Sequence, residues 1–162
     1  MTAQAWIAAV VGVAAVSDDL ARRQISNWIP AAAFGAGLIL QTAQAGWRGA
    51  GSALLGALAG AAVFLVFYLA GGMGGGDVKL MAGFGAVLGT KLLLQAALWT
   101  AGCGGLMAAS VIAARSVREL WARFGFGRKN AAAGATALSK RVDAIPYAPA
   151  ITAGVWLALV PK

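Results

Sequence analysis

Three aspartates stand out in this apolar chain as residues able to do chemistry: Asp18, Asp19 and Asp77. Asp77 comes directly after the glycine-rich run Gly71-Gly72-Met73-Gly74-Gly75-Gly76. A carboxylate among apolar segments is expensive, so it commonly marks a functional site or a specific ion pair. Glycines bring the backbone close to its surroundings and allow geometries that are closed to other residues. The sequence therefore predicts a site around Asp77, with the acids at 18 and 19 as candidate partners.

Two carboxylates that meet in a pocket of low dielectric constant cannot both ionise easily, so they share a proton and titrate as a unit. One then acts as a base on a water molecule, while the other, protonated, polarises a carbonyl group. This is aspartic-protease chemistry, and it needs no metal or cofactor. The same residues also fit a small proton- or cation-coupled transporter built on a glycine-broken helix. A third hypothesis is a structural subunit of a secretion assembly, in which the acids are ion-pair partners.

Other catalytic chemistries lack their residues in this sequence. The chain contains no histidine and one cysteine, Cys103. Ser-His hydrolysis, His-ligated haem, a cysteine zinc site and an internal disulfide are therefore excluded. We expect no metal site, and we interpret Cys103, which lies among glycines, as a packing residue.

The composition is that of an integral membrane protein with a single domain over residues 1–162. Hydrophobic residues make up 60% of the 162 residues, charged residues make up 11%, and the mean hydropathy is +0.78. A soluble domain carries about 25% charged residues. The net charge of +8 comes from basic residues clustered between apolar segments, as topology-setting charges are, so no nucleic-acid partner is expected. The segment 1–6 has no Lys or Arg, unlike a secretory signal.

Six apolar runs predict an all-α bundle of about six transmembrane helices. Only helices or closed barrels satisfy their backbone in lipid, and these runs do not alternate as barrel strands do. They cover about 3–17, 28–43, 51–70, 78–88, 92–114 and 145–160. In the third run, Gly56 and Gly60 have the small-xxx-small spacing of a close helix-packing surface.

The loop charges predict the orientation. Ten of the 13 basic residues fall in the loops on one side of the bundle, so the positive-inside rule makes that side cytoplasmic and leaves both termini outside. The three aspartates then lie toward the cytoplasm. Since 78–88 rises only about 16 Å against about 30 Å of hydrocarbon, Asp77 is expected below the membrane surface, beside a wet pocket. Two interpretations of the basic cytoplasmic loop 115–142 stay open. Its first residues form a short interfacial helix that binds anionic lipid, or its charges only set the topology.

Gly74-Gly75-Gly76-Asp77, followed by Val78-Lys79-Leu80, resembles the Gly-x-Gly-Asp motif of the type IV prepilin peptidases, the intramembrane aspartic proteases that mature pilins. A second motif of that family is an Asp six residues before an Ile/Leu-Pro-Asn/Asp turn. Asp19 has this spacing from Ile25-Ser26-Asn27, and Ile145-Pro146-Tyr147 is similar to the family's Pro-Tyr segment. The resemblance implies that Asp19, rather than Asp18, pairs with Asp77 as the catalytic dyad.

The resemblance further implies an aspartic endopeptidase that removes the short basic leader of a prepilin or pseudopilin, after Gly, at the cytoplasmic face of the bacterial inner membrane. Residues implied to support the motifs or bind substrate are Gly74, Gly75, Gly76, Lys79, Ile25, Asn27, Pro146 and Tyr147.

This sequence departs from the family pattern at two points. Ser26 stands where the family turn usually has Pro. The chain also lacks the loop of paired Cys-x-x-Cys zinc motifs that larger members carry and that is associated with N-methylation. It is therefore similar to the short peptidases of tight-adherence (Flp-type) pilus systems, and cleavage without methyltransferase activity is expected.

Overall fold

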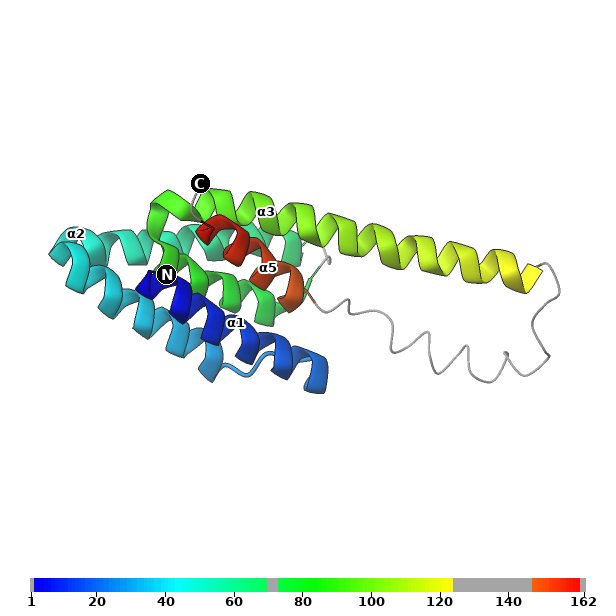
Figure 1. Cartoon of the computed structure of the whole chain (residues 1–162), viewed down its shortest axis with the longest axis horizontal. Helices are drawn as coiled ribbons and strands as arrows, with labels where there is room; N and C mark the ends of the chain where they lie inside the picture. The colour runs from blue at the N-terminus through cyan, green and yellow to red at the C-terminus, as the bar shows by residue number, and fades with distance from the viewer. Residues whose placement is uncertain (1, 70–72, 124–146, 161–162) are drawn as a thin grey trace.

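A computed structural model of the chain describes residues 2–69, 73–123 and 147–160, and this part is helical without a strand (Figure 1). The helices are α1 (Ala3–Arg22), α2 (Trp28–Leu69), α3 (Gly75–Arg123) and α5 (Ala148–Leu159). The prediction of an all-α fold is confirmed for these residues.

The prediction of six separate helices is not supported, because the described residues form four. Two of the expected breaks are kinks rather than loops, so that α2 and α3 each consist of two helical segments: α2 has non-helical backbone at Ala45 and Gly46, and α3 has it at Gly89. Gly46 and Gly89 both have positive φ, at 57° and 66°, which glycine adopts at no steric cost. Helical hydrogen bonding therefore resumes at once after each break, and the chain doubles back without a loop (Figure 1).

Helix ends differ from the sequence expectations at two further places. The first helix runs to Arg22 rather than to residue 17, and α3 runs to Arg123 rather than to residue 114. The first nine residues of the expected loop 115–142 are thus a continuation of α3, not a separate interfacial helix. The rest of that loop lies outside the described residues.

Among the residues that the structure describes, three helices are long and apolar enough to cross a membrane: α1, α2 and residues Gly75–Met107 of α3. Large apolar side chains stay exposed around the bundle, among them Trp47 at 92% and Leu106 at 76% exposure. Soluble proteins rarely expose so much apolar surface in continuous patches. Both observations fit a membrane protein.

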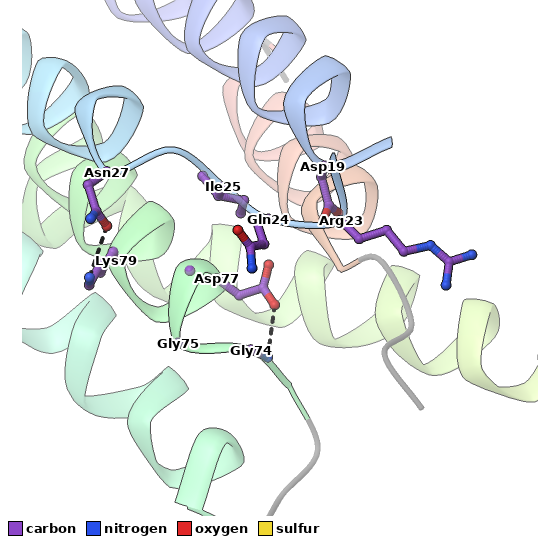
Figure 2. A pocket seen from close by; sticks show the side chains of 10 residues that line it. Asp19, Arg23, Gln24, Ile25, Asn27, Gly74, Gly75, Asp77 and Lys79 are labelled. Atoms are coloured by element: carbon purple, nitrogen blue, oxygen red, sulfur yellow. Dashed lines mark hydrogen bonds between the residues drawn. The ribbon is translucent and has the colours of Figure 1, made fainter. Parts of the chain in front are cut away.

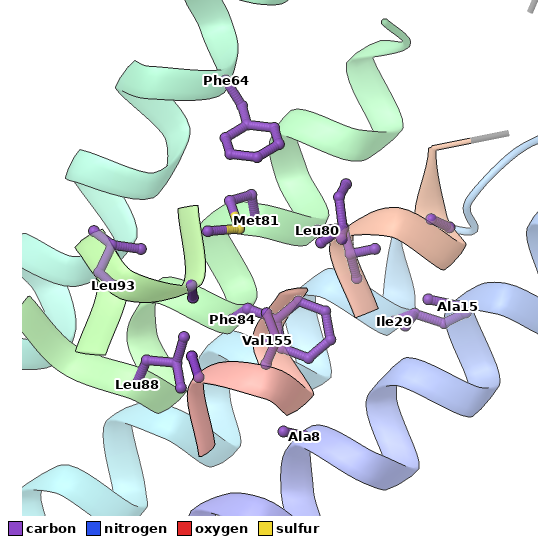
Figure 3. Packing of buried hydrophobic residues seen from close by; sticks show 14 residues of the cluster. Ala8, Ala15, Ile29, Phe64, Leu80, Met81, Phe84, Leu88, Leu93 and Val155 are labelled. Carbon is purple, nitrogen blue, oxygen red and sulfur yellow. The ribbon is translucent and has the colours of Figure 1, made fainter. Parts of the chain in front are cut away.

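The first segment of α3, residues 75–88, forms the centre of the bundle. Its side chains Leu80, Met81 and Phe84 are fully buried, and they pack against residues of α1, α2 and α5 such as Ala8, Ile29 and Val155 (Figure 3). The segment that begins beside Asp77 is therefore held by neighbours on several sides.

Helix α2 lies against this central segment with its backbone in contact. A Cβ atom added to Gly56 would collide with the carbonyl group of Gly85, and one added to Gly85 would collide with that of Gly56. A Cβ at Gly60 would stand 2.7 Å from the carbonyl oxygen of Met81. The packing surface predicted from the spacing of Gly56 and Gly60 is confirmed.

The Gly89 break is accompanied by buried amide contacts. The side-chain amides of Gln41 and Gln4 donate hydrogen bonds to the carbonyl oxygen of Val87, at 3.2 and 3.3 Å. Gln41 is buried, at 9% exposure. A buried backbone carbonyl needs such a donor, so this amide stabilises the bend.

Replacing Gln41 is expected to destabilise the fold. Gln41→Leu should lower the free energy of unfolding by about 1–2 kcal/mol, because one donor to Val87 is lost. Gln41→Glu, measured above neutral pH, should lower the free energy of unfolding further, because a carboxylate oxygen would then face the Val87 carbonyl oxygen and neither can donate a hydrogen bond. Thermal unfolding in detergent measures both. Thr42→Val is the control, since its exposed hydroxyl bonds only its own helix, at Leu38; equal stability of all three variants would contradict the prediction.

Candidate active site

One polar pocket of about 340 Å³ lies where the end of α1 meets the start of α3 (Figure 2). Its walls come from α1, from the turn 23–27 between α1 and α2, and from residues 74–79. The lining residues are Asp19, Arg23, Gln24, Ile25, Asn27, Gly74, Gly75, Gly76, Asp77 and Lys79. A pocket beside Asp77 was predicted from the sequence, and it is present.

Asp19 enters this pocket from the last turn of α1. Its residue is buried, at 7% exposure. Its Oδ2 atom accepts a hydrogen bond of 3.4 Å from the backbone N–H of Ala148, the first residue of α5. Helix N-termini present unpaired N–H groups and a positive dipole end, so α5 provides a favourable partner for this carboxylate.

Asp77 enters the same pocket from the first turn of α3, and it is equally buried, at 7% exposure. Its Oδ2 atom accepts the backbone N–H of Gly74 at 3.2 Å, and its own N–H donates to the Gly74 carbonyl at 3.1 Å. This reciprocal pair fixes the carboxylate at the helix start. The structure thus brings Asp19 and Asp77, 58 positions apart in sequence, to one pocket (Figure 2).

Asp18 has a different environment from its neighbour. It does not line the pocket. Its Oδ2 accepts the backbone N–H of Ser26 at 2.7 Å, and its Oδ1 lies 3.4 Å from Nε of Arg22. Adjacent helical residues point about 100° apart, which accounts for the separation of the two carboxylates.

The glycines before Asp77 serve close packing more than unusual backbone. Gly75 and Gly76 already belong to α3, and positive φ does not occur between residues 73 and 77. Gly75 and Gly76 therefore have regular helical backbone, while 71 and 72 lie outside the described residues. A Cβ at Gly76 would stand 3.3 Å from Cβ of Ile25, so glycine lets the turn 23–27 approach α3.

The remaining predicted residues divide between the pocket and its surroundings. Ile25, Asn27 and Lys79 line the pocket, and Nζ of Lys79 donates to Oδ1 of Asn27 at 2.9 Å. Tyr147 does not line it: this side chain is half-buried against the core, near Gly104. Pro146 lies outside the described residues.

Three residues at the site were not predicted to belong to it: Arg23, Gln24 and Ala148. Arg23 and Gln24 stand inside the spacing between Asp19 and Ile25, which was the available signal. Ala148 contributes its backbone N–H to Asp19, and a sequence pattern of side chains cannot predict such a contact. Within the described ranges, no cluster of three acidic or cysteine side chains could hold a metal ion.

Comparisons with known proteins identify the chain at family level. No curated protein and no solved structure matches it. A family model, that of the type IV leader peptidase family, matches residues 6–109, which is more than half of the chain and includes both Asp19 and Asp77. Members of a leader peptidase family are proteases that act on prepilin-type substrates, and three apolar helices of spanning length fit a membrane enzyme. The chain therefore belongs to the type IV leader peptidase family.

Proposed function

We propose that this protein is an intramembrane aspartic endopeptidase in which Asp19 and Asp77 form the catalytic dyad. The observation that carries the proposal is the single pocket lined by both buried carboxylates, in a chain of the leader peptidase family. Buried carboxylates are expensive unless they are paired or functional. Each carboxylate here accepts one backbone N–H: Asp19 accepts that of Ala148, and Asp77 accepts that of Gly74. These bonds hold the two side chains in place and leave them able to take or give a proton.

The dyad cleaves a peptide bond by acid–base catalysis. The ionised carboxylate takes a proton from a water molecule, whose oxygen attacks the carbonyl carbon of the scissile bond. The protonated carboxyl group donates a hydrogen bond to the carbonyl oxygen, where negative charge develops. When the tetrahedral intermediate collapses, the C–N bond breaks and the amine nitrogen receives the proton. Both acids are then returned to their starting forms.

The proposed enzyme spans the bacterial inner membrane with the pocket toward the cytoplasm. The breaks at Gly46 and Gly89 divide α2 and α3, so that six helical segments, with α1 and α5, would cross or enter the bilayer and leave both termini outside. Basic residues at the pocket, Arg23 and Lys79, support the orientation through the positive-inside rule. The segment 75–88 rises about 21 Å, less than the hydrocarbon thickness of about 30 Å, which supports a pocket below the surface.

The proposed substrate is a prepilin or pseudopilin with a short basic leader, of the Flp type, cut after Gly. The whole chain is one catalytic domain, the basic residues among 115–142 are on the cytoplasmic side near anionic lipid, and no methyl transfer follows cleavage. The test uses the purified protein in detergent and a synthetic prepilin carrying the Gly junction. Mass spectrometry should find one cut, directly after that Gly. A transporter would instead leave the prepilin intact and carry protons into liposomes.

Substitutions of the two motif glycines nearest Asp77 are expected to change KM for the prepilin by different amounts. Gly76→Val should raise KM for the prepilin about tenfold, because its side chain would push Ile25 and the turn 23–27 away from α3. Gly75→Ala should change KM by less than about twofold, since its Cβ would meet only Tyr68, at 3.6 Å, an ordinary contact. Initial rates over a range of prepilin concentrations measure both. Equal KM values for the two variants would refute this account of Gly76.

A further inference from the structure

Asp18 lies beside the catalytic site without belonging to it. This carboxylate is at the end of α1, one residue before Asp19, and it contacts Ser26 and Arg22, of which neither lines the pocket. Its contact with Ser26 crosses eight residues of chain and is the shorter, at 2.7 Å. A hydrogen bond to an ionised carboxylate is stronger than one between neutral groups.

The bond from Ser26 closes the turn 23–27 onto the helix that precedes it. Arg23 ends α1 in the left-handed region, with φ of 53°, and its N–H donates to the Asp19 carbonyl at 2.7 Å. The N–H of Ser26 then donates to Asp18, and the carbonyl oxygen of Ser26 accepts the N–H of Ile29, near the start of α2, at 3.0 Å. The turn is thereby attached to α1 on one side and to α2 on the other.

This turn forms one wall of the acid pocket. Gln24, Ile25 and Asn27 of the turn line the cavity together with Asp77 and Lys79 of α3 (Figure 2). Ile25 lies against Gly76, and Asn27 accepts a hydrogen bond from Lys79 of α3. The position of the turn therefore sets the width of the space in which a peptide meets Asp19 and Asp77.

We propose that Asp18 is a positioning residue: by accepting the Ser26 N–H, it holds the turn 23–27 as the preformed wall of the substrate pocket. The proposal rests on the proposed peptidase function for its effect on substrate, but not for the tether itself. Ser26 makes the tether possible, because a proline at this position would have no N–H to donate. The ion pair with Arg22 keeps the Asp18 carboxylate turned toward the helix end.

Amide hydrogen exchange in the full-length protein tests the tether without any substrate. In Asp18→Ala, the Ser26 amide should exchange at least about tenfold faster than in the wild type, because its acceptor is gone. In Asp18→Asn, which keeps an acceptor oxygen, the increase should stay below about threefold. The Asp77 amide, which bonds the Gly74 carbonyl, is the internal control and should not change. Unchanged exchange at Ser26 in Asp18→Ala would overturn the proposal, and so would an equal acceleration at both amides.

Cleavage kinetics test the consequence for substrate. Asp18→Ala should raise KM for the synthetic prepilin about tenfold and change kcat by less than about threefold, because Asp19 and Asp77 stay in place. In the separate variant Asp18→Asn, which keeps an acceptor oxygen, KM should stay within about threefold of the wild type. A fall in kcat and in thermal stability at unchanged KM would overturn the positioning role and leave Asp18 a merely structural residue. If the wild type itself cleaves nothing, the proposed function fails, whereas the exchange rates still decide whether the tether exists.

Discussion

Asp19→Asn and Asp77→Asn are each expected to lower kcat/KM for a prepilin substrate by about a thousandfold or more. An amide cannot take a proton from water, and it cannot supply one to the leaving nitrogen, so either change removes general acid–base catalysis. The substitution nearly preserves shape. The Asn side-chain oxygen can still accept the backbone N–H of Ala148 or of Gly74, which keeps the fold intact. Single-turnover cleavage of the synthetic prepilin, with purified variants of matched concentration, measures the loss.

Asp18→Asn is the matched control for this experiment, because it makes the same chemical change one residue away from Asp19. Its side chain does not line the pocket, so its kcat should stay within about threefold of the wild type. Thermal unfolding of all three variants checks that they are folded. The dyad is disproved if a folded Asp19→Asn or Asp77→Asn variant cleaves at the wild-type rate. The choice between the neighbouring acids is reversed if Asp18→Asn is inactive and Asp19→Asn is active.

Gly85→Val is expected to prevent the bundle from forming, with a loss of more than about 3 kcal/mol in the free energy of unfolding. The carbonyl of Gly56 already occupies the place where a side chain at 85 would begin. Both partners are helix backbone, so neither can move aside as a side chain would, and the α2–α3 contact must open. Circular dichroism during heating in detergent, together with size-exclusion chromatography, measures the loss of folded protein.

Gly105→Ala provides the comparison within the same helix. No atom lies within 4 Å of the place where its Cβ would stand, and the residue is in α3 beyond the Gly89 break. Alanine is favoured over glycine inside a helix by about 0.5–1 kcal/mol, so this variant should be as stable as the wild type or slightly more stable. Similar unfolding midpoints for Gly85→Val and Gly105→Ala would show that the close contact does not limit stability.

The sequence allowed the two pocket acids to be predicted because their motifs depend on local spacing. Asp77 is marked by the glycines before it, and Asp19 by a spacing to Ile25 and Asn27 that resembles the second motif of the family. Helical rotation then separates Asp19 from Asp18, which the structure also shows. The packing of Gly56 was predictable for the same reason, since four-residue spacing on a helix places small residues on one face.

The connections between these helices could not be predicted in this way. Hydropathy detects apolar runs and treats each interruption as a loop, whereas the chain reverses at Ala45–Gly46 and at Gly89 within one or two residues, with positive φ at both glycines. Nothing in composition distinguishes these two among 23 glycines. The tether from Asp18 to Ser26 was equally hidden, because it depends on the left-handed conformation at Arg23 that turns the chain back.

The hydrogen bond between Asp19 and Ala148 has a consequence for the order in which the enzyme is made. Its donor follows its acceptor by 129 residues, so a ribosome releases the two acids long before α5 emerges. Until α5 inserts, Asp19 lacks this N–H, and the face of the bundle that α5 covers with Ile151 and Val155 is open. The nascent protein would therefore hold both acids without a completed site, and proteolytic competence would begin with the insertion of α5.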